Sequence, residues 1–138
     1  MKDKNGFTLV ELLAVIVVLA IVVSIAVPST FAISNRIKKN LFCSKIDFIS
    51  NSAELYGEDR RDSFGTITID GASYKGKNVT VKELVTTNYL KKDHTSEPYI
   101  EDPRDKNNNL DNLNVSIYIK NNSVYVKFDN TVNETCGR

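Results

Sequence analysis

Apolar residues dominate the start of the chain. From Phe7 to Val27 the sequence is almost entirely apolar, and Glu11 is the only charged residue in that run. A helix of this length would span about 32 Å, close to the thickness of the hydrocarbon core of a bilayer. Because an ionised acid at membrane depth costs roughly 3 kcal/mol or more, Glu11 is a candidate functional residue.

A second pattern begins after Pro28. This proline is expected to kink a continuing helix, because it lacks an N–H and its ring clashes with the preceding turn. Further along, apolar residues recur at spacings of 4, 3, 4 and 3, which predicts one buried face of an amphipathic helix. The residues on this face are Phe42, Ile46, Ile49, Ala53 and Tyr56. The helix is expected to end within the charged run from Glu58 to Asp62.

The second half of the chain changes to a period of two. Residues 66–75 predict two short strands around Asp70-Gly71, a pair typical of a type I′ turn. Residues 114–130 alternate in the same way around Asn121-Asn122 and predict a second hairpin. Between them, Thr80 stands three residues before Glu83, the capping-box pattern that opens a helix. The sequence therefore predicts an α+β fold, with a long N-terminal helix packed on a small antiparallel sheet.

Length and charge limit the possible functions. The chain has 138 residues, which leaves room for one modest domain after the apolar run and too little for two. The hydrophobic fraction of 41% and the charged fraction of 25% are ordinary for a globular protein. The formal net charge is +1, so no broad basic surface for nucleic acid is expected.

Catalytic and metal-binding motifs are missing from the sequence. His94 is the only histidine, and a zinc site would need several histidine or cysteine ligands close together. We find no nucleophile–base spacing, no glycine-rich phosphate loop and no CxxC pair. We therefore expect no enzyme activity and no cofactor.

Several readings of the apolar run are compatible with its composition. It could be a secretory signal peptide, with an apolar region from Leu12 to Val23 and a cleavage site after Ser24-Ile-Ala26. An acid such as Glu11 brings no advantage to that kind of segment. It could also be a plain membrane anchor, and a count of flanking positive charges alone would place the C-terminus in the cytoplasm.

The residues "KNGFTLVELLAVI" resemble the N-terminus of a class III prepilin, the signature of type IV pilins and pseudopilins. The resemblance rests on a short charged leader that ends in Gly6, on Phe7 and Glu11, and on the apolar helix that leads to Pro28. It implies that a membrane-embedded prepilin peptidase cuts between Gly6 and Phe7 and methylates the new amine. It also implies that Glu11 neutralises the Phe7 amine of a neighbouring subunit during assembly.

The resemblance also divides the chain. It implies a leader at 1–6, a transmembrane and filament-core helix at 7–28, and an amphipathic helix with a globular pilin head at 29–138. Residues 80–92, followed by an Asp-Pro pair, are similar to the connecting region of Gram-positive pilins and secretion pseudopilins. The N-terminus would be cytoplasmic while the chain spans the membrane, against the charge count.

The implied function is that of a structural subunit, a major or minor pilin of a type IV pilus on a bacterial surface, with roles in adhesion or twitching motility. The expected partners are other pilin subunits, the prepilin peptidase, the assembly platform and the cytoplasmic membrane. One alternative is a pseudopilin of a type II-like secretion or DNA-uptake system. Another is a membrane-anchored adhesin or receptor that never polymerises.

Two further features concern the head. Cys43 and Cys136 are the only cysteines, and an even count in an exported chain suggests a disulfide, although two free thiols are the alternative. The polar loop at 102–112 matches only the first half of an EF-hand, so it is not one. Its carboxylates could still gather around calcium, as in some pseudopilins, or the loop could simply be solvated; the candidates are Asp102, Asp105 and Asp111.

Overall fold

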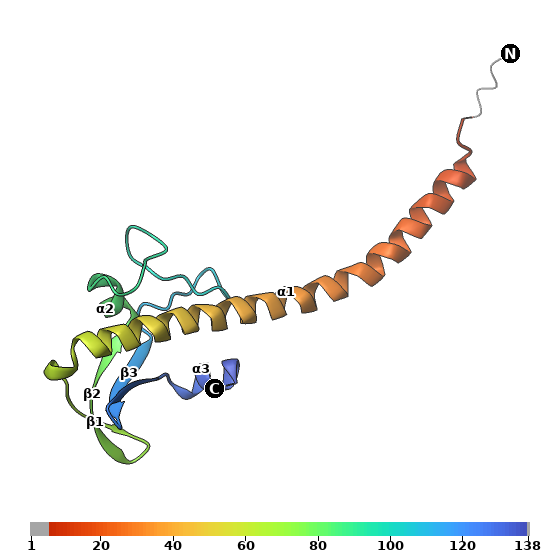
Figure 1. Ribbon diagram of the computed structural model, residues 1–138. Coiled ribbons are helices and arrows are strands. Elements are labelled where there is room, and N and C mark those ends of the chain that lie inside the picture. Colours follow the sequence, from red (N-terminus) through yellow and green to blue (C-terminus); the bar gives the residue numbers. More distant parts are fainter. Residues whose placement is uncertain (1–5, 138) are drawn as a thin grey trace. The chain divides into compact units, whose positions relative to one another are not determined.

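The computed structural model describes residues 6–137. The chain divides into two compact units, Met1–Ile37 and Lys38–Arg138. One helix, α1 (Leu9–Asp59), supplies the helical part of the first unit and continues into the second (Figure 1). Of the leader expected at residues 1–6, only Gly6 lies within the described residues.

Helix α1 is unbroken and contains Pro28. On either side of the proline, side-chain hydroxyls bond back to carbonyl groups of the same helix. Ser24 Oγ donates to the Ala20 carbonyl at 2.7 Å, and Thr30 Oγ1 donates to the Val27 carbonyl at 2.7 Å. Such bonds satisfy polar groups within an apolar helix. The expected continuation of the helix beyond Pro28 is confirmed, and the kink remains a prediction.

The second half of α1 packs on the head as the apolar spacing predicted. All five residues of the predicted face are buried, with exposed fractions of 0–1%; they are Phe42, Ile46, Ile49, Ala53 and Tyr56. The helix ends at Asp59, inside the expected charged run, and a short 3₁₀ turn (Arg61–Ser63) leads to the sheet. This face of α1 therefore forms one wall of the hydrophobic core.

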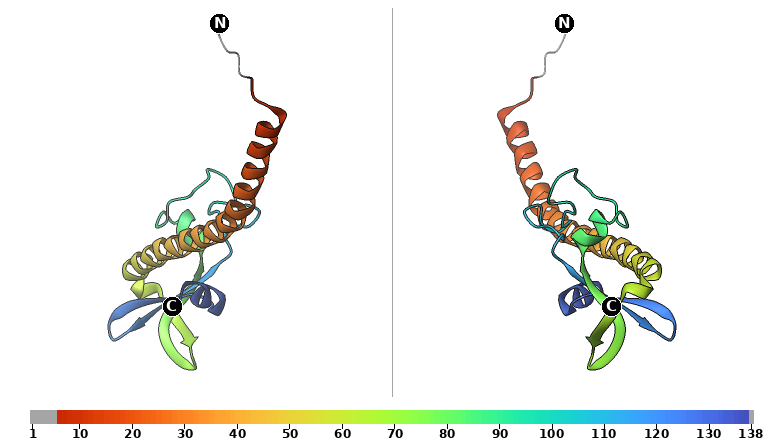
Figure 2. Two further views of the ribbon diagram at one scale, coloured as in Figure 1. Left: turned by 90° about the vertical axis from the view of Figure 1, so that its right-hand side faces the viewer. Right: turned by 90° about the vertical axis from the view of Figure 1, so that its left-hand side faces the viewer.

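The other wall is a four-stranded antiparallel sheet in the order β1 (Gly65–Ile69), β2 (Ala72–Thr80), β3 (Asn114–Lys120) and β4 (Ser123–Lys127). Both views in Figure 2 place this sheet on one side of the head half of α1. The two predicted hairpins are confirmed by the antiparallel pairing of β1 with β2 and of β3 with β4, and the residues of both turns have positive φ angles. These angles are 51° and 83° at Asp70-Gly71, and 49° and 65° at Asn121-Asn122.

A glycine allows the end of α1 to lie close to the sheet. A Cβ atom added to Gly57 would lie 2.7 Å from a methyl carbon of Ile117 and 2.7 Å from one of Val124. Real Cβ atoms do not approach other atoms so closely, and interiors are packed too densely to absorb the difference freely. Gly57 therefore sets the distance between the last turns of α1 and strands β3 and β4.

Helix α2 (Val81–Thr86) follows β2 and begins as the capping pattern predicted. Thr80 Oγ1 accepts a hydrogen bond from the Glu83 backbone N–H at 3.2 Å. The irregular segment from 87 to 113 then returns the chain to β3. Asp111 organises this return, because its carboxylate accepts hydrogen bonds from the backbone N–H groups of Tyr99 and Ile100 at 2.8–3.1 Å.

The chain ends in a third helix, α3 (Asn130–Cys136), which the sequence analysis did not anticipate. Asp129 caps its first turn by accepting from the Val132 N–H at 3.0 Å, and Gly137 closes it in the left-handed conformation with φ 68°. Both signals are present in the sequence. The helix has only seven residues, too few to be stable without tertiary contacts.

Candidate processing and assembly site

The first turn of α1 is held by a reciprocal capping box. Thr8 Oγ1 accepts from the Glu11 backbone N–H at 3.3 Å, and Glu11 Oε2 accepts from the Thr8 backbone N–H at 3.0 Å. The two side chains thereby satisfy two N–H groups that a helix N-terminus otherwise leaves without partners. The carboxylate of Glu11 also lies where the positive end of the helix dipole favours an acid.

The bond between Gly6 and Phe7 precedes this turn. Both residues are exposed and lie outside the helix, which begins at Leu9. A Cβ atom added to Gly6 would meet no atom within 4 Å. This part of the chain is therefore open to an enzyme that binds an extended peptide.

The geometry places Glu11 close to Phe7. Its carboxylate bonds the N–H of Thr8, which is the residue directly after Phe7. A carboxylate has two oxygens and can accept several hydrogen bonds, so the contact with Thr8 does not exhaust it. Glu11 was predicted to be functional and Thr8 was not, although the Thr-x-x-Glu spacing is itself the signature of a capping box.

The apolar part of α1 is long and apolar enough to cross a membrane. Its most apolar 18-residue window has a mean hydropathy of 3.1, and none of that window is buried within the described protein. Length and composition alone carry this result, and a signal sequence near the N-terminus would pass the same test. With the motif reported below, the segment fits membrane anchoring.

In the head, Cys43 and Cys136 form a disulfide. The S–S distance is 2.06 Å and the Cα atoms are 5.6 Å apart. The bond fastens the end of α3 to α1 across a sequence separation of 93 residues. Val132 of α3 is also buried, so the C-terminal segment joins the core by packing as well as by the covalent bond.

The three calcium candidates are not brought together. Asp111 bonds to backbone N–H groups of its own segment, and Asp105 accepts from the Asn107 backbone N–H at 2.9 Å. Within residues 6–137, no group of three or more His, Cys, Asp or Glu side chains is arranged to hold a metal ion. Each carboxylate instead organises the path of the polar loop.

Asp102 pairs with Arg104. The guanidinium donates to both carboxylate oxygens at 2.7–3.2 Å and lies over the ring of Phe42, 3.6 Å from its centroid. Burial by itself would raise the pKa of Asp102, but hydrogen bonds from the side chain and backbone of Arg104 outweigh it and lower the pKa. The pair fixes the polar loop against the core face of α1.

A second polar cluster, which no sequence pattern predicted, joins α1, β2 and α2. Lys77 Nζ lies 2.7 Å from Glu83 Oε1 and 3.1 Å from the Tyr56 hydroxyl, which also donates to Glu83 at 3.0 Å. The hydrogen bonds with Glu83 and Tyr56 raise the pKa of Lys77. Lys77 and Glu83 are six residues apart, whereas Tyr56 precedes them by 21 and 27 residues, and the packing of α1 on β2 and α2 brings it to the pair.

His94 lies on the surface, where its Nε2 is 3.7 Å from Glu101 Oε2. Neither this pair nor the two polar clusters combines a nucleophile with a base in a cleft, which is the arrangement that general catalysis needs.

The comparisons with known proteins point to the N-terminal end of the chain. The family model described as the prokaryotic N-terminal methylation motif matches residues 1–27. No curated protein and no solved structure matches the chain. The matched segment contains Gly6, Phe7 and Glu11 together with most of the apolar run. The match is confined to this end of the chain, and it supports the resemblance to the type IV pilin and pseudopilin family.

Proposed function

We propose that the chain is a structural subunit of a type IV pilus. The observation that carries the proposal is the combination at the start of α1 of the methylation motif, an exposed Gly6–Phe7 bond and a capped apolar helix. The compact head beyond Ile37 supplies the globular part of such a subunit. The same motif also fits a pseudopilin of a secretion or DNA-uptake system, which is the second candidate.

In this proposal, prepilin peptidase hydrolyses the amide bond between Gly6 and Phe7 and methylates the amine that is released. The product begins with a positive charge on Phe7, four residues before Glu11. An opposite charge within about 4–6 Å favours the ionised form of a carboxylate in a poor solvent. Glu11 then pairs with the amine of a neighbouring subunit, and this pairing sets the register of assembly.

The capping box gives Glu11 a second task. Before assembly its carboxylate closes the first turn of α1, and during assembly it also accepts the neighbour's amine. Thr8 orients the carboxylate toward the end of the helix, where that amine has to arrive. This account explains why an acid is kept inside an apolar segment at a cost of roughly 3 kcal/mol.

The remaining assignments follow from the same proposal. Residues 7–28 span the cytoplasmic membrane before assembly, with the N-terminus inside, and enter the filament core afterwards. Pro28 kinks the helix between this segment and the head. The partners are other pilin subunits, the peptidase and the assembly platform, and the chain has no enzymatic activity of its own. The filament is exposed on the bacterial surface.

Mass spectrometry of sheared surface filaments tests the processing. The expected chain begins at methylated Phe7. A mature chain that begins at Val27 would show that the apolar run is a signal peptide. Processed chains that remain in the membrane fraction and never enter filaments would favour a non-polymerising adhesin or receptor.

Two substitutions separate the two tasks of Glu11. Glu11→Gln keeps an oxygen that can accept from Thr8 and removes the charge, whereas Glu11→Ala removes both. If the charge pairs with the neighbour's amine, both variants are cleaved and both enter filaments poorly. Normal incorporation of Glu11→Gln together with poor incorporation of Glu11→Ala would leave only the capping task.

A further inference from the structure

The head half of α1 has a second apolar stripe that does not face the core. Leu41, Phe48 and Leu55 follow one another at seven-residue spacing and are 54%, 69% and 54% exposed. Seven residues make almost two full helical turns, so the three side chains project from one face. Large apolar groups left in line on a surface are typical of an interaction site.

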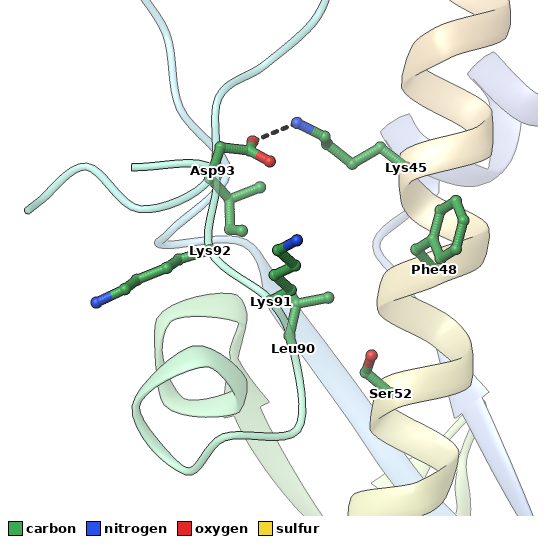
Figure 3. Close-up of a pocket in the computed structure, with 8 residues that line it drawn as sticks. Lys45, Phe48, Ser52, Leu90, Lys91, Lys92 and Asp93 are labelled. Atoms are coloured by element: carbon green, nitrogen blue, oxygen red, sulfur yellow. Dashed lines mark hydrogen bonds and ion pairs between the residues drawn. The ribbon is translucent and has the colours of Figure 1, made fainter. Parts of the chain in front are cut away.

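A groove runs beside this stripe. It has a volume of about 680 Å³ and lies between α1 and the segment Leu90–Asp93 (Figure 3). Phe48 and Ser52 line it from the helix, and Ile100 lines it from the returning chain. One end is held by the ion pair between Lys45 and Asp93, at 2.5 Å. The groove is therefore formed by fixed elements of the head.

The rim of the groove is basic. Lys91 and Lys92 both line it and are exposed. The ammonium group of Lys92 points away from α1 at the outer rim and lies 5.7 Å from the centre of the Tyr99 ring (Figure 3). Lys91 has no partner among the residues that the structure describes. A ligand for this surface would combine an apolar contact with negative charge.

The same helix offers a matching surface on another face. Asp47 and Glu54 are seven residues apart, so they share one line along α1, and both are exposed. Six residues separate Phe48 from Glu54, which places them about 120° apart around the helix. Helix α3 lies on the other side of α1 from α2, as Figure 1 shows. The acidic line and the groove thus belong to different faces of α1 in the head.

We propose that the groove receives the acidic face of α1 from a second copy of this chain, with Glu54 of that copy placed against Lys91 and Lys92. The proposal rests on the proposed function, since it assumes that the chain polymerises. Because the two surfaces are different parts of one head, the contact is heterologous, and a repeated heterologous contact that does not close into a ring generates a helical filament. The stripe around Phe48 is covered by the same contact.

A charge exchange tests the contact in the full chain, in cells whose only copy is the variant. Lys91→Glu with Lys92→Glu places acids against Glu54 of the neighbour, and the amount of sheared filament is expected to fall about tenfold. Adding Glu54→Lys reverses the charge on the opposite side of the contact and is expected to restore filaments. The matched control is Lys75→Glu with Lys120→Glu, which makes the same change of charge on exposed lysines of the sheet.

Each outcome decides a separate point. A loss with the lysine pair that Glu54→Lys restores, while the control assembles normally, supports the contact. Normal filaments from the lysine variant overturn the contact and leave the proposed function standing. If the lysine variant loses filaments and Glu54→Lys does not restore them, the acidic face of a second copy is not what the groove receives. If the unmodified chain forms no filaments at all, the proposed function fails and the contact fails with it.

Discussion

Removal of the disulfide between Cys43 and Cys136 is expected to destabilise the head without changing its structure. The bond closes a loop with a sequence separation of 93 residues, and it restricts mainly the unfolded chain. The chain-entropy relation for a loop of this length gives a loss of about 4.6 kcal/mol at 25 °C. Native domains are stable by about 5–15 kcal/mol, so this loss is a large part of the total.

The measurement is urea unfolding of the full chain in a mild detergent, followed by near-ultraviolet circular dichroism. With an m-value of about 1.5 kcal/mol per M, the loss lowers the midpoint by about 3 M. The variant Cys43→Ser, the variant Cys136→Ser and the double variant should all show the same loss, since each removes the same bond. The wild-type chain after reduction should agree with them.

Loss of the disulfide is expected to destabilise the whole head, and a purely local effect would refute this prediction. If the bond only fastened the C-terminal segment, hydrogen exchange would accelerate in α3 alone and the urea midpoint would not move. Independent losses that add in the double variant would also contradict a shared bond. The native spectrum of the double variant is expected to match that of the wild type, because the buried Val132 still holds α3.

Three further predictions concern other contacts. Gly57→Ala is expected to destabilise the head by about 1 kcal/mol in urea unfolding, because overpacking against the sheet exceeds the gain in helix propensity. The control is Gly65→Ala, whose Cβ would meet no atom within 4 Å. Equal losses of stability in the two variants would contradict the close contact at Gly57. Because Arg104 lowers the pKa of Asp102, the ion pair stabilises the head above about pH 4, and this stabilisation is lost as the pH falls through the lowered pKa. Asp102→Asn should therefore reduce the slope of unfolding free energy against pH in this acidic range. An unchanged slope would contradict the contribution of the pair. Thr8→Val should lose about 1 kcal/mol of capping free energy, so that the first turn of α1 frays, whereas Thr8→Ser should keep the cap. NMR of the chain in detergent measures the fraying, and equal spectra for the two variants would refute the cap.

The sequence alone determined the elements whose hydrogen bonds and packing repeat locally. The apolar spacing after Pro28 was sufficient to predict the buried face of α1, since a helix repeats every 3.6 residues whatever surrounds it. The turns at Asp70-Gly71 and Asn121-Asn122 were equally local, because positive φ angles favour these residues. The motif around Glu11 is a short continuous stretch, so it too was readable. Helix α3 had readable end signals and was missed because so short a helix depends on tertiary support.

Only the tertiary structure decided which distant polar groups meet. Asp102 was a plausible calcium ligand in sequence, but its carboxylate pairs with the nearby Arg104, and the fold places that guanidinium over Phe42 of α1. Glu83 was predicted as part of a helix cap, and the fold also brings the Tyr56 hydroxyl of α1 to its side chain across a sequence separation of 27 residues. The packing of α1 against the rest of the head selects these long-range contacts. A partner far away in the chain leaves no periodic trace in the sequence, because its position depends on how every intervening residue packs.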